Sequence, residues 1–409
     1  MVKERILQRF SGMPKLLQIN VTANWGSTGK IAEAIGVCAI KQGWASYIAY
    51  GGFCNPSRNK LIRIGCKASR YLHYAEQRIL DNEGQCSRIE TRKLIKQIGD
   101  IKPDIISLHN IHDHYLNYRI LFEYLNQTDI KVVWTFHDCW AITGHCMHFV
   151  TKNCERWKTG CHDCLMKGEY PKSFLDCSER NWKLKKNLFA RNKNLTVVAC
   201  SNWIAEFVRE SFLKDKRIEV IHNGCDIDVF SPQARTKSDK FRIIAVSNVW
   251  HRNKGELDIY KLRSMLSEDE YEIIMVGLSI EQVNKLPFGI KGIVRTQNVQ
   301  ELAQLYSDAD VLVNPTYEDN FPTVNIEALA CGTPVITYRT GGSPEALDEF
   351  TGAVVETGDL NALCKKILEF NAINFKENHS IDCRKRSEQL FDKDKSFKKY
   401  VDFYDSLLK

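Results

Sequence analysis

The sequence predicts an α/β protein made of two domains, each built on a parallel sheet. The chain has 409 residues, which is too long for one hydrophobic core and suits two domains. Short apolar runs typical of buried strands alternate with stretches of helical period, first in one half and then in the other. A polar stretch, QARTKSDK, follows Pro232 and separates the two series. In such domains ligands bind at the carboxyl ends of the strands, so we expect the site in a cleft between the two.

The first half holds six apolar runs that we interpret as buried strands. They span Lys15–Val21, Ile48–Tyr50, Asp104–Leu108, Lys131–Thr135, Thr196–Ala199 and Ile218–Ile221. A helix is expected over Gly29–Lys41, between the first two strands, and further helical stretches separate the others. This strand–helix alternation predicts parallel pairing with right-handed connections.

The second half repeats the pattern with four further runs. They span Phe241–Val246, Tyr271–Val276, Val311–Val313 and Val335–Thr337. Apolar residues at helical spacing precede the third of these runs, from Val299 to Tyr306. A last helix is expected over Ser396–Leu408.

The segment from Pro315 to Glu345 is the most informative part of the chain. A polar loop follows the third strand of this half, and Pro322 then suits the first turn of a helix, where its missing N–H costs nothing. That helix should end near Gly332, and the next strand leads into Gly341-Gly342. Free backbone N–H groups and the positive end of a helix dipole suit a phosphate group. Two acids in the segment suit sugar hydroxyls, so the combination describes a nucleotide sugar.

The residues Asp319-Asn320-Phe321-Pro322, followed by Glu327, resemble the donor-site signature of the retaining family 4 glycosyltransferases, which have the GT-B fold. The family has a Glu where Asp319 stands, unless Glu318 takes that role, and a Gly where Asn320 stands. The resemblance implies that Glu327 accepts from the ribose and that the loop cradles the donor sugar. The alternative is a surface acid pair on an ordinary α/β unit. The donor-binding residues that it implies here are Glu318, Asp319, Asn320, Phe321, Pro322, Thr323 and Glu327.

A cation is expected near the end of the strand Phe241–Val246. Lys254 stands before a glycine there and matches the family lysine that neutralises the departing diphosphate, and Arg252 is the available arginine. The reaction needs positive charge at this place because the leaving group is an anionic nucleotide diphosphate. The alternative is a flexible lysine on the surface.

Two histidines follow strands of the first half and are expected in the cleft. They are His109 and His137, and His137-Asp138 matches the family better, where a histidine lies near the donor sugar. Such a residue can hydrogen-bond the sugar or steer deprotonation of the acceptor, although a single histidine is more often a core or capping residue. Retaining transfer in this family needs no protein nucleophile, so we nominate none. The predicted catalytic residues are therefore His109, His137, Asp138, Lys254, Asp319 and Glu327.

The loop Asn24–Lys30 contains two glycines, Gly26 and Gly29, directly after the first strand. Its spacing excludes a P-loop and the dinucleotide-binding fingerprint. Its position fits the glycine loop of family 4 enzymes, which approaches the donor diphosphate and the acceptor. A plain strand-to-helix turn is the alternative.

Cysteines gather in an insert over about 139–177. Cys146, Cys154, Cys161 and Cys164 lie within 19 residues, and the last two have the C-x-x-C spacing of a zinc knuckle. In a reducing compartment clustered thiols favour a metal over disulfides. We predict a structural zinc ion and no catalytic metal; free thiols or a redox pair are the alternatives.

Composition bears on location and partners. No run of 18 apolar residues occurs, and the N-terminus lacks a signal-peptide core, which predicts a cytoplasmic protein. The net charge is +7, and residues 151–200 hold eleven Lys or Arg against five Asp or Glu. The stretch Arg180–Arg191 is read either as a basic amphipathic helix on the inner face of an acidic membrane or as a solvated helix packed by its apolar side. Binding to nucleic acid is a less favoured explanation of this charge, because no nucleic-acid-binding motif accompanies it.

Together these features predict three parts: a Rossmann-like acceptor-side domain over 1–235 with the Cys-rich insert, a Rossmann-like nucleotide-sugar domain over 236–390, and a terminal helix over 391–409. As in GT-B enzymes, that helix would return to the first domain. The predicted function is retaining transfer of a hexose from a UDP or GDP sugar to a glycan or lipid-linked acceptor, in bacterial surface polysaccharide assembly. A GT-B-like scaffold without turnover and a nucleotide-sugar epimerase are the alternatives.

Overall fold

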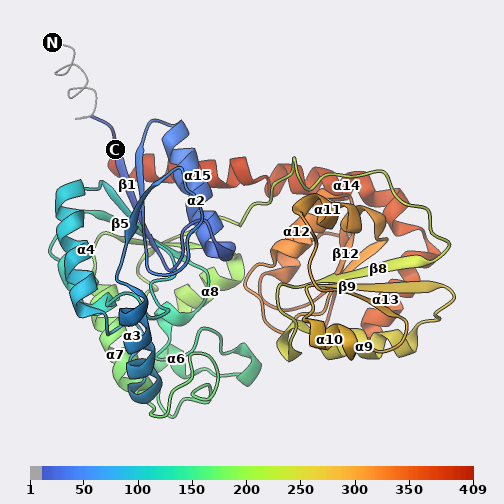
Figure 1. The fold of residues 1–409 in the computed structure, drawn as a ribbon, viewed down its shortest axis with the longest axis horizontal. Coiled ribbons are helices and arrows are strands. Elements are labelled where there is room, and N and C mark those ends of the chain that lie inside the picture. The colour runs from blue at the N-terminus through green and yellow to red at the C-terminus, as the bar shows by residue number, and fades with distance from the viewer. Residues whose placement is uncertain (1–11) are drawn as a thin grey trace. The chain divides into compact units, whose positions relative to one another are not determined.

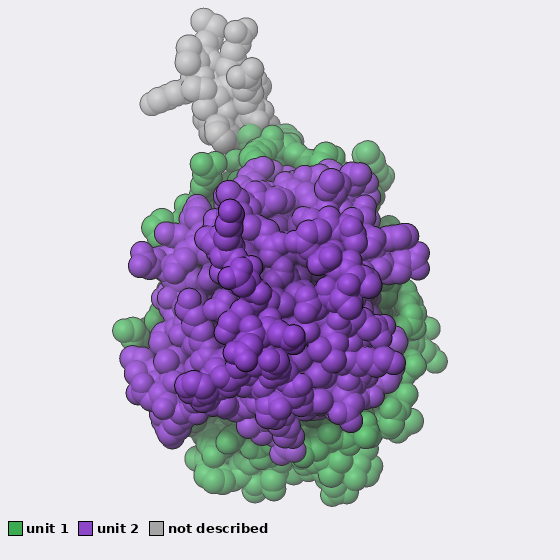
Figure 2. Space-filling model, turned by 90° about the vertical axis from the view of Figure 1, so that its right-hand side faces the viewer, with its two compact units in different colours: residues 1–221, 397–409 green, residues 222–396 purple. Residues whose placement is uncertain are grey.

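The computed structural model describes residues 12–409 and divides into two compact units. Unit 1 comprises residues up to Ile221 together with Phe397–Lys409, and unit 2 comprises His222–Ser396 (Figure 2). The division lies between Ile221 and His222, earlier than the boundary predicted after residue 235. The first eleven residues, on which part of the signal-peptide argument stands, lie outside the described residues. No helix in the described part of the chain is long and apolar enough to cross a membrane.

Unit 1 is built on a seven-stranded sheet in the order β3-β2-β1-β4-β5-β6-β7, in which every neighbouring pair is parallel (Figure 1). The strands are β1 Lys15–Asn20, β2 Ala45–Tyr50, β3 Lys60–Arg63, β4 Ile105–Leu108, β5 Lys131–Phe136, β6 Leu195–Ala199 and β7 Arg217–Val220. The central strands are almost continuous apolar runs because helices cover both faces of a parallel sheet. The chain order reverses between β1 and β4, which makes that point the expected ligand position.

Helices connect the strands of unit 1, except that β2 leads to β3 without one. They are α2 Gly26–Lys41, α3 Lys67–Leu80, α4 Arg88–Ile101, α5 Tyr118–Leu125, α6 Arg156–Thr159, α7 Ser178–Arg191 and α8 Asn202–Glu210, with short 3-10 turns at η1 Trp140–Ile142 and η2 Val150–Lys152. The last helix, α15 Lys393–Leu408, adds its C-terminal part to this unit. Its Tyr400 and Tyr404 are fully buried in a cluster with Leu16 of β1 and Ile105 of β4.

Unit 2 is built on a six-stranded parallel sheet in the order β10-β9-β8-β11-β12-β13 (Figure 1). The strands are β8 Phe241–Val246, β9 Tyr271–Val276, β10 Ile290–Ile293, β11 Val311–Asn314, β12 Val335–Tyr338 and β13 Gly352–Val355. The reversal of strand order falls between β8 and β11.

Helices and 3-10 turns connect these strands. They are η3 Arg252–Lys254, α9 Glu256–Met265, α10 Ile280–Asn284, α11 Val299–Asp308, α12 Thr323–Ala330, η4 Ser343–Ala346, α13 Leu360–Ala372 and α14 Phe375–Leu390. Ile243, Ile273 and Val313 of the sheet pack with Leu262 of α9 and Leu363 of α13 in one hydrophobic core. This core holds the carboxyl ends of β8 and β11 in place, and the loops that leave them carry most of the residues predicted to bind the donor.

Candidate functional site

The loops after β8 and β11 are joined by a charged pair in unit 2. Lys254 Nζ donates to Asp319 Oδ2 at 2.6 Å and to the carbonyl oxygen of Glu318 at 3.1 Å. Asn253 Nδ2 donates to Glu318 Oε2 at 3.1 Å, and the backbone N–H of Tyr317 donates to the carbonyl oxygen of Asn253. The structure thus brings together Lys254, Glu318 and Asp319, which the sequence predicts for the donor site. Both side chains of the Lys254–Asp319 pair remain about one quarter exposed, so a ligand can reach them.

Two glycines permit this close approach of the loops. Gly255 and Gly341 both have positive φ, +74° and +55°, a region that side chains rarely adopt. A Cβ at Gly255 would overlap the backbone of Pro315, and a Cβ at Gly341 would overlap the carbonyl oxygen of Asp319. The N–H of Gly342 also donates to the carbonyl oxygen of Asn320 at 3.1 Å. The glycine turn after β12 therefore supports the loop that carries Asp319.

Glu327 lies on α12, which begins directly after the same loop. Its Oε2 accepts from the hydroxyl of Tyr306 at 3.1 Å. Burial, and next the Glu327 carboxylate, raise the pKa of Tyr306 well above its ordinary value, so this hydroxyl stays a donor. Pro322 stands at the N-cap with no side-chain cap, one position before the first turn where the sequence predicts it. Thr323 is the first helical residue.

The other residues that the sequence predicts for donor binding have distinct surroundings. Arg252 is exposed in η3, while Asn320 is partly buried. Phe321 is 4% exposed, and its ring contacts the His222 ring with 4.8 Å between centroids. His222 Nε2 pairs with Glu345 Oε2 at 2.7 Å. Sequence reasoning did not nominate His222 or Glu345 as site residues, although Glu345 stands only three positions after Gly342 of the glycine turn.

In unit 1, His109 and His137 meet at the carboxyl ends of β4 and β5. His109 Nδ1 lies 3.0 Å from His137 Nε2, and the rings stack at 5.3 Å between centroids. His109 Nε2 lies 3.2 Å from Gln18 Oε1, and both residues are fully buried. Burial lowers the pKa of His109 well below its ordinary value and that of His137 to about 4. Both rings are therefore neutral near pH 7, and a hydrogen bond joins them. They line a small recess together with Trp134, Asp138 and Trp140.

Asp138 forms an ion pair with His112 inside unit 1. His112 Nε2 donates to Asp138 Oδ2 at 2.9 Å, and the N–H of Trp140 donates to its Oδ1 at 2.8 Å. Although burial opposes ionisation, His112 lowers the pKa of Asp138 to about 2, and Asp138 in turn raises the pKa of His112. This charged pair fixes the loop after β5, on which His137 also stands.

A second buried pair supports the loop after β4, and sequence reasoning missed it. Glu83 Oε1 accepts from the N–H of Asp113 at 2.7 Å and from that of His114 at 3.1 Å, and Glu83 Oε2 lies 2.9 Å from His114 Nε2. Burial opposes the charge on His114, but Asp113 and Glu83 raise its pKa to about 9. No local pattern signals a contact between residues 31 positions apart.

Gly26 and Gly29 stand in the first turn of α2, which begins three residues earlier than predicted. Gly26 has φ +65° and is exposed, with open space where a Cβ would point. Gly29 is buried, and a Cβ there would lie 2.5 Å from Thr22 Oγ1. Gly29 is therefore required for packing of α2 on the loop after β1. No side chain at Gly26 covers the surface at the end of β1.

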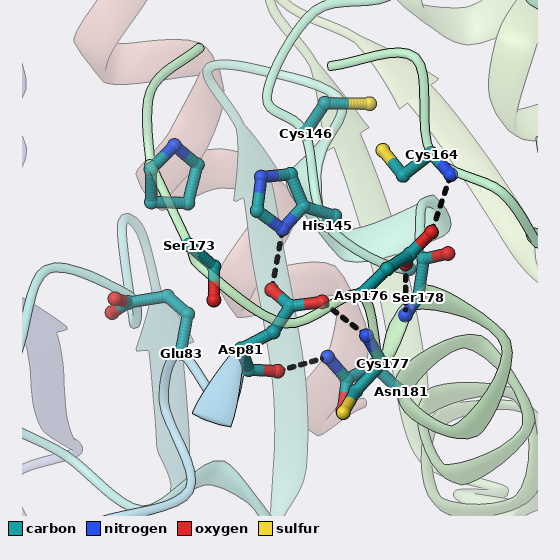
Figure 3. Close-up of polar contacts among 12 residues, drawn as sticks. Asp81, Glu83, His145, Cys146, Cys164, Ser173, Asp176, Cys177, Ser178 and Asn181 are labelled. Atoms are coloured by element: carbon teal, nitrogen blue, oxygen red, sulfur yellow. Dashed lines mark hydrogen bonds and ion pairs between the residues drawn. The ribbon is translucent and has the colours of Figure 1, made fainter. Parts of the chain in front are cut away.

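The Cys-rich insert is held to α3 and α7 by polar contacts, of which the Asp81–His145 pair is buried (Figure 3). Asp81, at the end of α3, pairs with His145 Nδ1, and its Oδ2 accepts from the N–H of Cys177 at 2.8 Å. Asp176 accepts from the N–H groups of Cys164 at 2.6 Å and Ser178 at 2.9 Å. These carboxylates order the loops on which the cysteines stand.

The thiols of the insert interact with one another. The sulfur atoms of Cys146 and Cys164 lie side by side, and a hydrogen bond from Cys146 lowers the pKa of the Cys164 thiol to about 7. Cys161 Sγ accepts from the N–H of Gly144 at 3.2 Å. Among the described residues the structure shows no group of three or more His, Cys, Asp or Glu side chains placed to hold a metal ion.

Lys185 of α7 is buried beside these thiols. Its Nζ donates to the carbonyl oxygens of Trp140 at 2.6 Å and Thr143 at 3.0 Å and lies 3.4 Å from the centroid of the Trp140 ring. Burial lowers its pKa to about 7, and the Cys161 and Cys146 thiols oppose that shift. The apolar side of α7 faces the interior, since Trp182 and Phe189 are buried. The membrane interpretation of this helix is therefore wrong, and packing by its apolar side is what the structure shows.

Comparisons with known proteins agree with this architecture. Residues 70–229 match the model described as Glycosyltransferase Family 4, and residues 240–371 match the model described as Glycosyl transferases group 1. The putative colanic acid biosynthesis glycosyl transferase WcaC of Escherichia coli K12 is 24% identical, with 96% of this chain and 100% of that protein covered.

Solved structures show the same fold over nearly the whole chain. Sucrose-phosphate synthase from Thermosynechococcus elongatus superimposes with a TM-score of 0.72 at 17% identity, covering 97% of this chain and 99% of that one. Anabaena HepE in complex with UDP-glucose has a TM-score of 0.61 at 14% identity, covering 96% and 99%. With two parallel α/β units and both family models matched, the chain belongs to glycosyltransferase family 4 and is a glycosyltransferase with the GT-B fold.

Proposed function

We propose that this enzyme transfers a sugar, with retention of configuration, from a nucleotide diphosphate sugar to a glycan or lipid-linked acceptor in the assembly of a surface polysaccharide. The observation that carries the proposal is the Lys254–Asp319 pair at the reversal point of the unit 2 sheet. A cation beside a hydroxyl-binding acid matches a diphosphate beside a sugar. The full-length similarity to WcaC supports the polysaccharide role, and the UDP-glucose bound to Anabaena HepE supports a donor of the UDP type.

In unit 2, the donor diphosphate would replace Asp319 as the partner of Lys254. Lys254 already holds an anionic oxygen of Asp319, so a β-phosphate can take that place and release Asp319 to accept from a sugar hydroxyl. Glu327, which accepts from the Tyr306 hydroxyl, would also accept from a ribose hydroxyl. Positive charge at Lys254 then stabilises the leaving diphosphate as its charge grows.

In unit 1, His137, whose ring is held by the buried His109, would bind a hydroxyl group. The bond from C1 of the sugar to the phosphate breaks, and a bond from C1 to the acceptor oxygen forms on the same face. The acceptor proton passes to the departing phosphate, so no covalent protein intermediate is needed. His137 is suited to hydrogen-bond the sugar because its low pKa keeps it uncharged.

Product analysis tests this reaction directly. Purified enzyme is supplied with UDP-, GDP- and ADP-hexoses and a panel of lipid-linked and free glycans, and the anomeric configuration of the product is read by NMR. We expect an acceptor-dependent product with the anomeric configuration of the donor. An inverted product would contradict retention, and isomerised donor formed without any acceptor would identify an epimerase.

We further propose that the insert binds a structural zinc ion through Cys146, Cys154, Cys161 and Cys164. Four thiols within 19 residues match the ligand number of such a site, and the thiols already interact. Binding would draw these side chains around one ion. The Lys185 ammonium, which has no carboxylate partner among the described residues, would then face the negative charge of a tetrathiolate centre.

Metal analysis of protein purified without chelator tests the zinc proposal. We expect one zinc ion per chain, lost in Cys161→Ser and retained in Cys38→Ser, a change to a partly buried cysteine outside the insert. Native protein that folds, transfers sugar and contains no stoichiometric zinc would contradict it.

A further inference from the structure

Helix α3 presents an apolar face to solvent. Its exposed positions include Tyr71 and Leu72, each 73% exposed, and Ile79, 53% exposed. With Ala68 and Ala75, also exposed, these residues recur at the spacing that forms one side of a helix. A contiguous apolar side that faces water is unusual for a soluble surface and indicates a docking site.

The rotation of α3 is fixed by polar groups on its inner side. His73 and Gln77 are each 1% exposed. His73 Nδ1 lies 2.8 Å from Ser87 Oγ, its Nε2 accepts from the N–H of Gly84, and Gln77 Nε2 donates to the carbonyl oxygen of Lys172 at 3.2 Å. Turning the apolar side inward would leave these buried groups without partners, so the exposed face is a stable feature of the fold.

A neighbouring loop extends this face. The N–H of Phe174 donates to the carbonyl oxygen of Arg78 at 2.9 Å, and the Arg78 guanidinium lies 4.8 Å from the Phe174 ring centroid. Phe174 is 67% exposed and Leu175 is 50% exposed. The loop is therefore fastened to the end of α3 and adds large apolar side chains beside it.

Basic residues accompany these apolar groups. Over 67–80 and 165–175 the chain has five Lys or Arg against two Asp or Glu. Lys67 and Lys172 are exposed, and Tyr71 and Tyr74 add aromatic rings with polar tips. Aromatic rings of this kind favour the boundary between lipid and water, and lysine and arginine are attracted to anionic headgroups.

We propose that α3 and residues 170–175 form the surface by which this enzyme attaches to an anionic lipid bilayer. The apolar side of α3 and Phe174 would enter the headgroup region, while Lys67, Arg78 and Lys172 lie against phosphate groups. This extends the proposed use of a lipid-linked acceptor, but it rests on no residue of the donor site.

Vesicle sedimentation of the full chain tests the surface. We expect binding to vesicles of phosphatidylglycerol and phosphatidylcholine, with weak binding to phosphatidylcholine alone and weaker binding at high salt. Leu72→Ser/Ile79→Ser should reduce binding at least fivefold. The control Leu368→Ser/Ile381→Ser, which removes similar side chains 45% and 68% exposed on α13 and α14, should bind as the native protein does.

The results of these measurements support or contradict the bilayer-binding surface. Thermal unfolding and transfer to a water-soluble acceptor should be unchanged in both variants, which separates failure of this surface from failure of the proposed function. Equal binding by the native protein and Leu72→Ser/Ile79→Ser, or no binding to anionic vesicles, would overturn the proposal. A concentration-dependent dimer abolished by the α3 variant without any vesicle binding would assign the face to a second copy instead.

Discussion

Several residues of this enzyme are held in place by partners that lie far away in the sequence. His109 and His137 were predicted from their places after strands, and the structure brings their rings into contact. The sequence cannot reveal that Glu83 holds the loop between them, because that contact joins distant segments. Lys185 is a similar case. It stands in a run of basic residues typical of a solvated face, yet it is 1% exposed and bound by two carbonyl oxygens.

The Glu83–His114 pair leads to a prediction about pH. In the folded protein the pKa of His114 is raised to about 9, above its ordinary 6.5. Its stabilisation is therefore complete below about pH 6.5 and is lost as the pH rises through about 9. Glu83→Gln should lower the free energy of unfolding by about 1–3 kcal/mol at pH 6–7, because the buried His114 charge loses one of its two carboxylate partners and keeps only Asp113. The loss should shrink by pH 10.

Urea unfolding of both proteins from pH 6 to 10 measures this difference. The control Glu123→Gln alters an exposed carboxylate paired with Arg119 and should change stability little at any pH. A difference for Glu83→Gln that stays constant up to pH 10 would show that His114 is not the group involved.

At the scale of elements, apolar runs predicted the interior strands well and the sheet edges poorly. β8 and β9 have the predicted bounds, because both are buried strands with long apolar runs. β3, β10 and β13 were missed, and all three lie at sheet edges with only four residues each. An edge strand is covered less completely, so its sequence need not be a continuous apolar run. The loop that carries Asp319 was predictable because its glycines and prolines mark the turns.

The turn after β12 gives a prediction at this scale. Gly341→Ala should displace the Asp319 loop, because its Cβ would overlap the Asp319 carbonyl oxygen and φ is +55°. We expect donor affinity to fall about tenfold or more, together with a loss of stability of at least about 1 kcal/mol. Gly99→Ala is a matched control, since Gly99 lies inside α4 with open space at its Cβ, and it should stabilise the protein slightly. Isothermal titration with the preferred donor measures the affinity, and native affinity in Gly341→Ala would show that this turn does not support the donor loop.

At the scale of the whole molecule, the two series of strands in the sequence correspond to two units, each with its own core. The position of their division was not predictable, because the polar stretch after Pro232 lies inside unit 2 and only contacts reveal that His222 begins it. The last helix supplies buried aromatic residues to unit 1, and the Tyr404 hydroxyl donates to Ser107 Oγ at 3.0 Å. Unit 1 is thus completed by residues from the far end of the chain.

The most direct test of the account is donor binding by Lys254→Gln in the whole enzyme, measured by isothermal titration with UDP-, GDP- and ADP-hexoses and followed by transfer kinetics. Lys261→Gln, which changes an exposed lysine of α9, is the control. We expect one donor to bind the native protein and the control equally, and Lys254→Gln to lose about 10²–10³-fold in kcat/KM. Native donor affinity and native turnover in Lys254→Gln would contradict the placement of the nucleotide diphosphate between η3 and the Asp319 loop.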